Sequence, residues 1–131
     1  MFIPVHRHLI LFAAVRKPIT EVGDCSYFLL NTIKNAGMTC ISGPHVVNVK
    51  DQGNEGLTGT ATLAESHTSI HIWEKALPVP YVQFDLYSCK EFPVDIIVNQ
   101  FKSMDPTVIR WSLFDRDGGD CELIEKRSIT F

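Results

Sequence analysis

The sequence predicts an α+β fold: a two-layer sandwich in which two helices cover one face of an antiparallel sheet. Roughly six or seven segments are rich in β-branched and aromatic residues, whereas only two segments repeat apolar residues at helical spacing. A strand-rich chain with so few helices is typical of a sheet covered on one side. The other sheet face is then left to solvent or to a partner subunit.

The chain is predicted to begin with a buried strand followed by a helix. Residues 6–15 contain a dense apolar run suited to a strand. Pro18 and Thr20 are typical of a helix start. Apolar residues then recur at helical spacing as far as Ala36, and Gly37 is a natural helix terminator.

The middle of the chain is predicted to be almost entirely strand. Residues 38–49 form a strand interrupted at Gly43-Pro44, and a polar loop follows over residues 50–56. Residues 58–73 are β-prone throughout. The second half of this segment alternates, with Ser69, His71 and Trp73 on one face and Thr68, Ile70 and Ile72 on the other.

The last third is predicted as strand, helix and two strands. A turn at residues 75–80 precedes an alternating strand over residues 81–89. A strand opening at Pro106 and a last strand over residues 122–129 are joined by a glycine-containing turn. The helix before them has one apolar stripe, made of Val94, Ile97, Phe101 and Met104.

Length, composition and charge restrict the class of protein. The 131 residues suit one domain, and a formal net charge of −3 gives no basic surface for nucleic acid. The apolar runs are too short to span a membrane, and the N-terminus does not resemble a signal peptide. Four dispersed cysteines indicate reduced thiols and a cytoplasmic location. His6 and His8 share a strand face, but no third ligand follows at suitable spacing, so no metal site is predicted.

The stretch from Glu65 to Glu74 carries the densest set of reactive side chains. It contains a hydroxyl, two imidazoles and carboxylates, and a thiol lies on the next strand. A strand advances about 3.3 Å per residue, so Ser66 and His71 are roughly 15 Å apart if the strand is straight. They cannot form a Ser-His dyad of ordinary geometry without a bend or bulge near His67. Spacing alone therefore does not define a reaction.

The same stretch resembles the processing-site signature of the bacterial and archaeal S-adenosylmethionine decarboxylases. In that family Glu-Ser-His-x-x-Ile-His-x-Trp is followed by Tyr-x-x-x-Asp-x-aromatic-x-Cys. The matching residues here are Glu65-Ser66-His67, Ile70-His71, Trp73, Tyr81, Asp85, Tyr87 and Cys89. Two further matches are Gly56-Leu57-Thr58-Gly59, which resembles a Gly-x-Ser-Gly stretch, and Arg7-His8-Leu9, which resembles the opening strand.

This resemblance implies that the chain cuts itself. Ser66 Oγ would attack the Glu65 carbonyl, and elimination would leave a β chain, residues 1–65, and an α chain, residues 66–131, headed by a pyruvoyl group made from Ser66. The pyruvoyl group would form a Schiff base with a small amine-bearing substrate and act as an electron sink for decarboxylation. By the same resemblance His71 would transfer protons during processing with help from the Thr58 hydroxyl, and Cys89 would protonate the decarboxylated product.

The resemblance favours S-adenosylmethionine as the substrate, which would supply the aminopropyl donor for polyamine synthesis. Substrate-binding candidates are Trp73, Glu74, Asp51 and Glu55. The chain departs from the family in having Trp73-Glu74 for Trp-Pro-Glu, Lys90 for glycine, and no adenine-stacking aromatic residue in residues 46–55. These differences leave open a decarboxylase of ornithine, arginine or lysine, or a non-processing homologue that binds or regulates. A homodimer of processed subunits is expected to cover the free sheet face.

Overall fold

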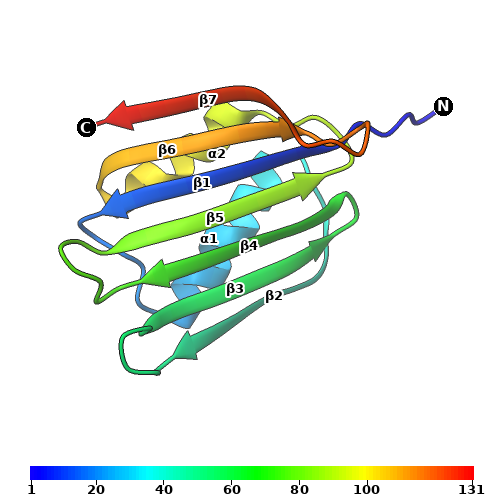
Figure 1. The fold of residues 1–131 in the computed structure, drawn as a ribbon. Coiled ribbons are helices and arrows are strands. Elements are labelled where there is room, and N and C mark those ends of the chain that lie inside the picture. Colours follow the sequence, from blue (N-terminus) through cyan, green and yellow to red (C-terminus); the bar gives the residue numbers. More distant parts are fainter.

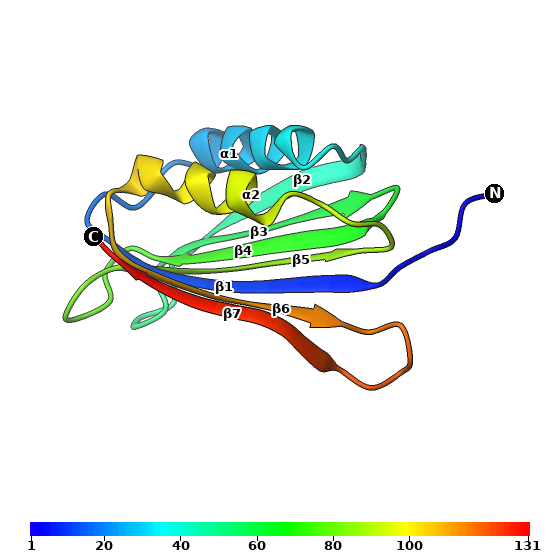
Figure 2. The same cartoon turned by 90° about the horizontal axis from the view of Figure 1, so that it is seen from above.

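Seven antiparallel strands form one sheet in the order β2-β3-β4-β5-β1-β6-β7, and both helices lie on the same side of it (Figures 1 and 2). The computed structural model describes all residues from Met1 to Phe131. The predicted α+β sandwich is therefore confirmed. The elements are β1 (Arg7–Val15), α1 (Val22–Asn35), β2 (Cys40–Val49), β3 (Gly56–Leu63), β4 (Ser66–Trp73), β5 (Tyr81–Ser88), α2 (Val94–Gln100), the 3-10 helix η1 (Phe101–Met104), β6 (Pro106–Asp115) and β7 (Glu122–Thr130).

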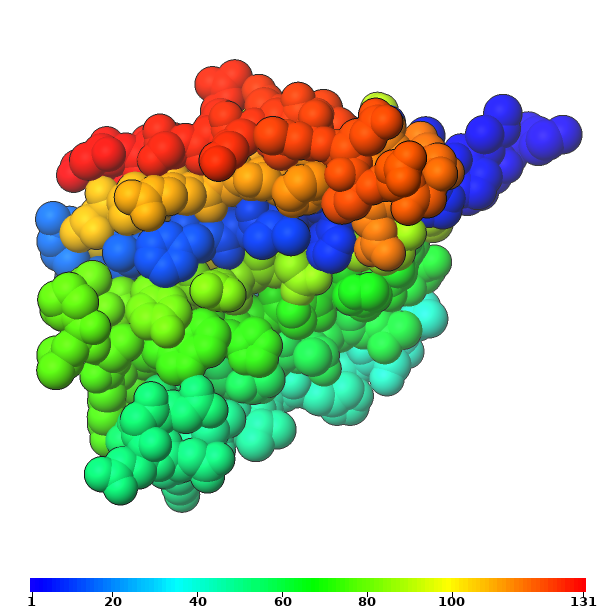
Figure 3. All heavy atoms as spheres, viewed as in Figure 1, coloured from blue at the N-terminus to red at the C-terminus, as the bar shows by residue number.

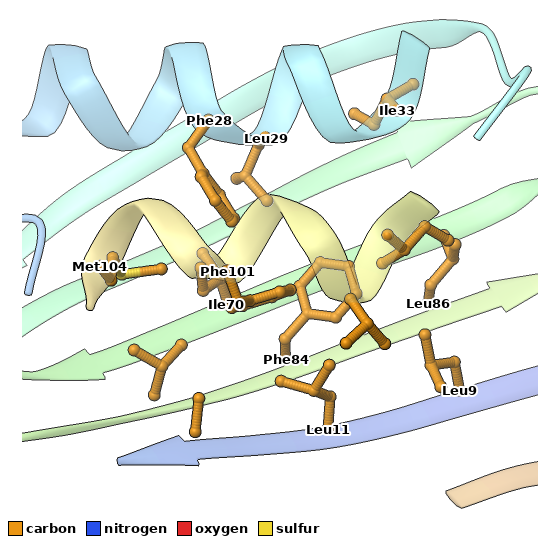
Figure 4. Close-up of a cluster of buried hydrophobic side chains, with 14 of the residues drawn as sticks. Leu9, Leu11, Phe28, Leu29, Ile33, Ile70, Phe84, Leu86, Phe101 and Met104 are labelled. Atoms are coloured by element: carbon orange, nitrogen blue, oxygen red, sulfur yellow. The ribbon is translucent and has the colours of Figure 1, made fainter. Parts of the chain in front are cut away.

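The hydrophobic core fills the space between the sheet and the helices. Phe101 lies at its centre, with ring centroids 5.1 Å from Phe28 of α1 and 5.2 Å from Phe84 of β5, both edge-on. Figure 4 shows these rings between the helices and the apolar residues of the central strands. Ile97, Phe101 and Met104 are fully buried, which confirms the predicted apolar stripe. The stripe continues from α2 into η1 because both segments pack on the same part of the sheet.

The first helix begins later than the sequence predicts. It starts at Val22 rather than near Pro18, and Glu21 is the residue that precedes it. The reason is that the backbone N–H groups of Arg16 and Lys17 donate to the carbonyls of Asp105 and Met104, which keeps this connection extended. The end of the helix is as predicted: Gly37 has a φ of +75°, a conformation that glycine adopts without a Cβ penalty.

The β-prone segment in the middle of the chain is two strands, not one. β3 and β4 form a hairpin closed by Ala64 and Glu65, and Leu63 pairs with Ser66 across the turn. Thr68, Ile70 and Ile72 are buried beneath the helices, as their alternation predicted. The predicted interruption of β2 is also present, as two register shifts between Cys40 and His45.

The sheet face opposite the helices has no helix over it. Figure 3 views this open face, on which the strands lie side by side from β7 to β2. Alternate residues of the strands point toward it. No helix of the protein is both long and apolar enough to cross a membrane. The outward residues of the central strands include His8, Ile10 and Phe12 of β1, Ser69, His71 and Trp73 of β4, and Asp85 and Tyr87 of β5.

Candidate active site

The predicted site residues lie at opposite ends of β4, here called the Ser66 end (Glu65, Ser66, His67 and Cys89) and the Trp73 end (Thr58, His71, Trp73, Glu74 and Tyr81). β4 pairs with both β3 and β5 along its whole length without a register shift. The bend that a Ser66–His71 dyad would need is therefore absent. At about 3.3 Å per residue, Ser66 and His71 of one chain are about 15 Å apart.

Backbone strain is concentrated at Ser66. Two-residue hairpin turns normally use residues with positive φ, which matches the twist of the strands. Neither Ala64 nor Glu65 has a positive φ, whereas Ser66 has a φ of 149°, a region occupied almost only by glycine. Such a conformation costs on the order of 1–3 kcal/mol and persists only where surrounding contacts impose it.

Contacts on both sides of Glu65 impose that geometry. Its carbonyl oxygen accepts a hydrogen bond of 2.8 Å from the backbone N–H of Cys89. Its side-chain carboxylate accepts one of 3.0 Å from the backbone N–H of Thr39, and Lys90 Nζ lies 3.9 Å from the other carboxylate oxygen. Lys90 also donates to the Gly37 carbonyl, so the residue that replaces the family glycine helps to hold the turn. Both the carbonyl group and the side chain of Glu65 are thus held in place next to the Glu65–Ser66 peptide bond.

Cys89 differs from the other cysteines in its position. It follows β5 directly after Ser88, which pairs with Ser66, and it is half-buried. Cys25, in contrast, is fully buried in the core, and desolvation raises the pKa of its thiol to about 11. All four thiols are free. Cys89 is the cysteine whose backbone N–H contacts the carbonyl of the Glu65–Ser66 bond.

At the Trp73 end, aromatic and hydroxyl side chains form a connected row. Thr58 Oγ1 and His71 Nδ1 are hydrogen-bonded at 3.2 Å across β3 and β4. The His71 ring stacks on Trp73 with centroids 5.5 Å apart, and Trp73 stacks on Tyr81 at 4.8 Å. Tyr81 in turn lies 5.6 Å from Phe12. Thr58 and His71, which family resemblance assigned separately to processing, are therefore in direct contact.

Acidic residues lie next to this row. One carboxylate oxygen of Glu74, Oε2, is buried without a hydrogen-bond partner. An unpaired buried acceptor is costly, so such an atom indicates a place for a donor from outside the chain. Trp73 Nε1 donates to Asn54 Oδ1 at 2.7 Å, which ties the ring to the loop that carries Asp51 and Glu55. Glu55 accepts from the backbone N–H of Gly53.

A polar network between the two ends was not predicted as part of a site. His8 Nε2 donates to Asp85 Oδ2 at 2.9 Å, and Ser69 Oγ donates to the other oxygen of Asp85. Arg116 Nη1 lies 3.3 Å from His8 Nδ1, and since arginine only donates, this nitrogen accepts and Nε2 carries the proton. The guanidinium of Arg116 also covers the Tyr87 ring at 4.1 Å.

The Asp85 carboxyl is the most perturbed group of this network. Burial alone would raise its pKa, but the hydrogen bonds from His8 and Ser69 outweigh burial and hold its pKa below the usual range. A shallow hollow of about 270 Å³ opens beside it on the open face, lined by His8, Ile10, Ser69, His71, Gln83, Phe84 and Asp85. The sequence signals for this network were the alternation of polar residues along β4 and β5 and the matches of His8, Asp85 and Tyr87 to family motifs, none of which gave these residues a role in a site.

Comparisons with known proteins identify the family of this chain. The model of the family "S-adenosylmethionine decarboxylase" matches residues 11–117. An S-adenosylmethionine decarboxylase proenzyme of Methanococcus maripaludis is 35% identical over 76% of this chain and 80% of its own length. One of Methanococcus vannielii is 32% identical over 70% and 72%. This chain therefore belongs to the S-adenosylmethionine decarboxylase family.

Among solved structures, a phage SAM lyase in its apo state covers 97% of this chain and 90% of that chain, with 10% identity and a TM-score of 0.48. A likeness at this level carries no argument about function.

Proposed function

We propose that this chain is a carboxy-lyase that decarboxylates S-adenosylmethionine after cutting itself between Glu65 and Ser66. Family membership favours this substrate over ornithine, arginine and lysine, and it favours an enzyme over a non-processing homologue. The observation that carries the processing step is the Ser66 end itself. A strained serine follows a carbonyl group that a backbone N–H already polarises.

The first step of processing is attack of Ser66 Oγ on the Glu65 carbonyl carbon. The C–O bond forms, and negative charge develops on the Glu65 oxygen, to which the Cys89 N–H already donates. The C–N bond then breaks and the Ser66 nitrogen takes up a proton, which leaves an ester. The strained φ of Ser66 is released when its peptide bond to Glu65 is gone. The Cys89 N–H therefore stabilises the developing oxyanion, and the release of strain favours the ester over the peptide.

The second step removes the proton from Ser66 Cα and breaks the ester at Ser66 Cβ. Elimination leaves a β chain, residues 1–65, ending in the Glu65 carboxylate, and an α chain, residues 66–131, headed by dehydroalanine. The dehydroalanine tautomerises to an imine, which water hydrolyses to a pyruvoyl group with release of the Ser66 nitrogen as ammonia. When formed, this group supplies a carbonyl that binds the substrate amine and accepts electrons as carbon dioxide leaves. The Cys89 backbone contacts Glu65 at this end of β4, and we assign its thiol as the proton donor that the product then needs.

The separation of the two ends supports a homodimer. Ser66 and Trp73 of one chain are about 23 Å apart along a straight strand, which is longer than the substrate. His71 is also too far from Ser66 to act on it within one chain. A two-fold axis through the open face would set the Ser66 end of one protomer against the Trp73 end of its partner. Each active site is then built from both protomers.

The Trp73 end has the chemistry that a nucleoside needs. The Trp73 and Tyr81 rings offer a stacking surface, which compensates for the aromatic residue missing from residues 46–55. The unpaired oxygen of Glu74 can accept a ribose hydroxyl. Asp51 and Glu55 lie on the loop attached to Trp73 and suit the cationic part of the substrate. A cytoplasmic location and a role in polyamine synthesis fit free thiols and this substrate.

The test combines mass spectrometry with a substrate panel. Purified protein should consist of two chains split between Glu65 and Ser66, the second blocked at its N-terminus. Ser66→Ala should stay full length and release no carbon dioxide, because alanine has no oxygen to attack the carbonyl. The processed protein should prefer S-adenosylmethionine over ornithine, arginine and lysine in kcat/KM. A tenfold preference for an amino acid would overturn the substrate, and a wild type that never cleaves would overturn the enzyme.

A further inference from the structure

Processing of the kind proposed above needs two separate proton acceptors. One takes the proton from Ser66 Oγ as the oxygen attacks, and the other takes the proton from Ser66 Cα during elimination. His71, the residue that family resemblance assigns to proton transfer, lies about 15 Å from Ser66 in the same chain. Within one chain a different group is therefore needed to accept the proton of Ser66 Oγ, and in the proposed dimer the partner's His71 is left to accept the Cα proton.

We propose that His67 is the base that activates Ser66. Its Nδ1 lies 3.4 Å from Ser66 Oγ, and His67 is the only residue whose side chain is within hydrogen-bond reach of that oxygen. Proton transfer needs about 2.6–3.2 Å, and such distances are commonly longer before reaction than during it. This inference rests on the proposed self-cleavage and assigns a residue to its first step.

The surroundings of His67 suit a group that becomes positively charged. Its ring lies on the open face with its centroid 5.6 Å from that of Tyr87, and it is exposed, so water solvates the charge while the ring holds the proton. The Asp85 carboxylate lies on the same open face and is fixed there by hydrogen bonds from His8 and Ser69.

The proton and electron count is complete in this step. The Oγ–H bond breaks and its proton goes to His67 Nδ1. The Oγ electron pair forms the new bond to the Glu65 carbon, and the carbonyl pair moves to the oxygen held by Cys89 N–H. When the tetrahedral centre collapses, the C–N bond breaks and the Ser66 nitrogen receives the proton from His67. The base is regenerated, and no oxidant or metal is needed.

Substitution of the two histidines should consequently stop processing at different stages. Without His67 the ester does not form, whereas without His71 the ester forms and accumulates because the elimination step is blocked. Hydroxylamine distinguishes these states because it cleaves an ester, leaving a hydroxamate on Glu65 and a free Ser66, but does not cleave the peptide. Imidazole in solution distinguishes them as well, because it can replace a missing base at an exposed position.

The experiment follows cleavage of freshly purified full-length protein over time by intact mass. His67→Ala should cleave about 10²–10⁴ times more slowly than wild type, recover with added imidazole, and remain uncut by hydroxylamine. His71→Ala should be cut by hydroxylamine. His45→Ala, which removes an exposed histidine on β2, should cleave at the wild-type rate.

Two results would overturn the assignment of His67. One is wild-type cleavage in His67→Ala, and the other is rapid cutting of that variant by hydroxylamine. If His67→Ala does not give the wild-type circular dichroism spectrum, His67→Asn replaces it, because asparagine can hydrogen-bond to Ser66 but cannot take its proton. Wild-type cleavage in His67→Asn would equally reject the proposal. Failure of wild type itself to cleave would instead reject the proposed function.

Discussion

The two ends of β4 are built in different ways. At the Ser66 end, backbone groups dominate: a strained φ, a carbonyl held by Cys89 N–H, and a carboxylate held by Thr39 N–H. At the Trp73 end, side chains dominate: stacked rings, a Thr58–His71 hydrogen bond and an unpaired Glu74 oxygen. The first arrangement suits a reaction on the chain itself, whereas the second suits recognition of a planar ligand. Because the length of β4 separates the two ends, each chain would supply its Ser66 end to one active site of the proposed dimer and its Trp73 end to the other.

The strongest test of this comparison mixes two defective chains. Ser66→Ala and His71→Ala alone should each yield no pyruvoyl-blocked α chain. In a mixed dimer, the His71→Ala chain still has Ser66 and meets the intact His71 of its partner. If the chains pair at random, about half of the His71→Ala chains should be processed. Intact mass with differently tagged chains measures this fraction.

The control for mixing uses Ser66→Ala with a chain that carries both substitutions. That pair should give no processed chain at all. An absence of processing in the first mixture, with mixed dimers demonstrated by sedimentation or tag capture, would contradict a site shared between protomers.

Cys89→Ala separates cleavage from turnover at the Ser66 end. The backbone N–H of residue 89 is unchanged, so the variant should still cut itself. Its kcat should fall by about 10²–10⁴ because the thiol proton donor is lost. Carbon dioxide release by fully processed protein measures this, with Cys121→Ala, which removes an exposed thiol, as the control. A kcat equal to that of wild type would remove Cys89 from the reaction.

Trp73→Ala should affect the other end and act mainly on substrate binding. Stacking of a base on an aromatic ring contributes about 1–3 kcal/mol, so KM should rise about 5- to 150-fold. Trp73→Phe should retain most of the affinity because a ring is still present beside Tyr81. Steady-state kinetics on processed protein provides the values. An unchanged KM in the alanine variant would place the base elsewhere.

Of these substitutions, Asp85→Asn should have the smallest effect, a decrease in the free energy of unfolding. The pKa of Asp85 is lowered in the folded protein, so its stabilising contribution is present above the unfolded pKa of about 3.9 and is lost as pH falls through the folded value. The variant should be less stable than wild type at pH 7 by on the order of 1 kcal/mol, since a quarter of the side chain is exposed. Urea unfolding should show this gap narrowing toward pH 3; a constant gap would contradict the linkage.

The strands and the core followed from the sequence because alternation and helical spacing report directly on burial. Thr68, Ile70 and Phe101 were placed correctly for this reason. The hairpin turn at Ala64 and Glu65 was not evident, because neither residue is typical of a turn. The chain reverses there through contacts with Thr39 and Cys89, which are distant in sequence.

The site was predictable only as a set of residues. Resemblance to a family identified Ser66, His71 and Cys89, and strand geometry gave the distance between the first two. The sequence alone did not predict that His8, Asp85 and Arg116 form one network, because they come from β1, from β5 and from the turn after β6, which are far apart in the chain. The nearness of His67 to Ser66 Oγ also needed side-chain coordinates.

The position of β1 requires that the sheet fold before the proposed cleavage takes place. The proposed cleavage after Glu65 would assign β1, β2, β3 and α1 to one product and β4 to β7 with α2 to the other. Yet β1 is hydrogen-bonded between β5 and β6, in the middle of strands that belong to the second product. Neither product can complete a sheet without the other. The sheet would therefore form while the chain is still continuous. After the proposed cleavage, the two products would stay joined through the hydrogen bonds of β1 to β5 and to β6.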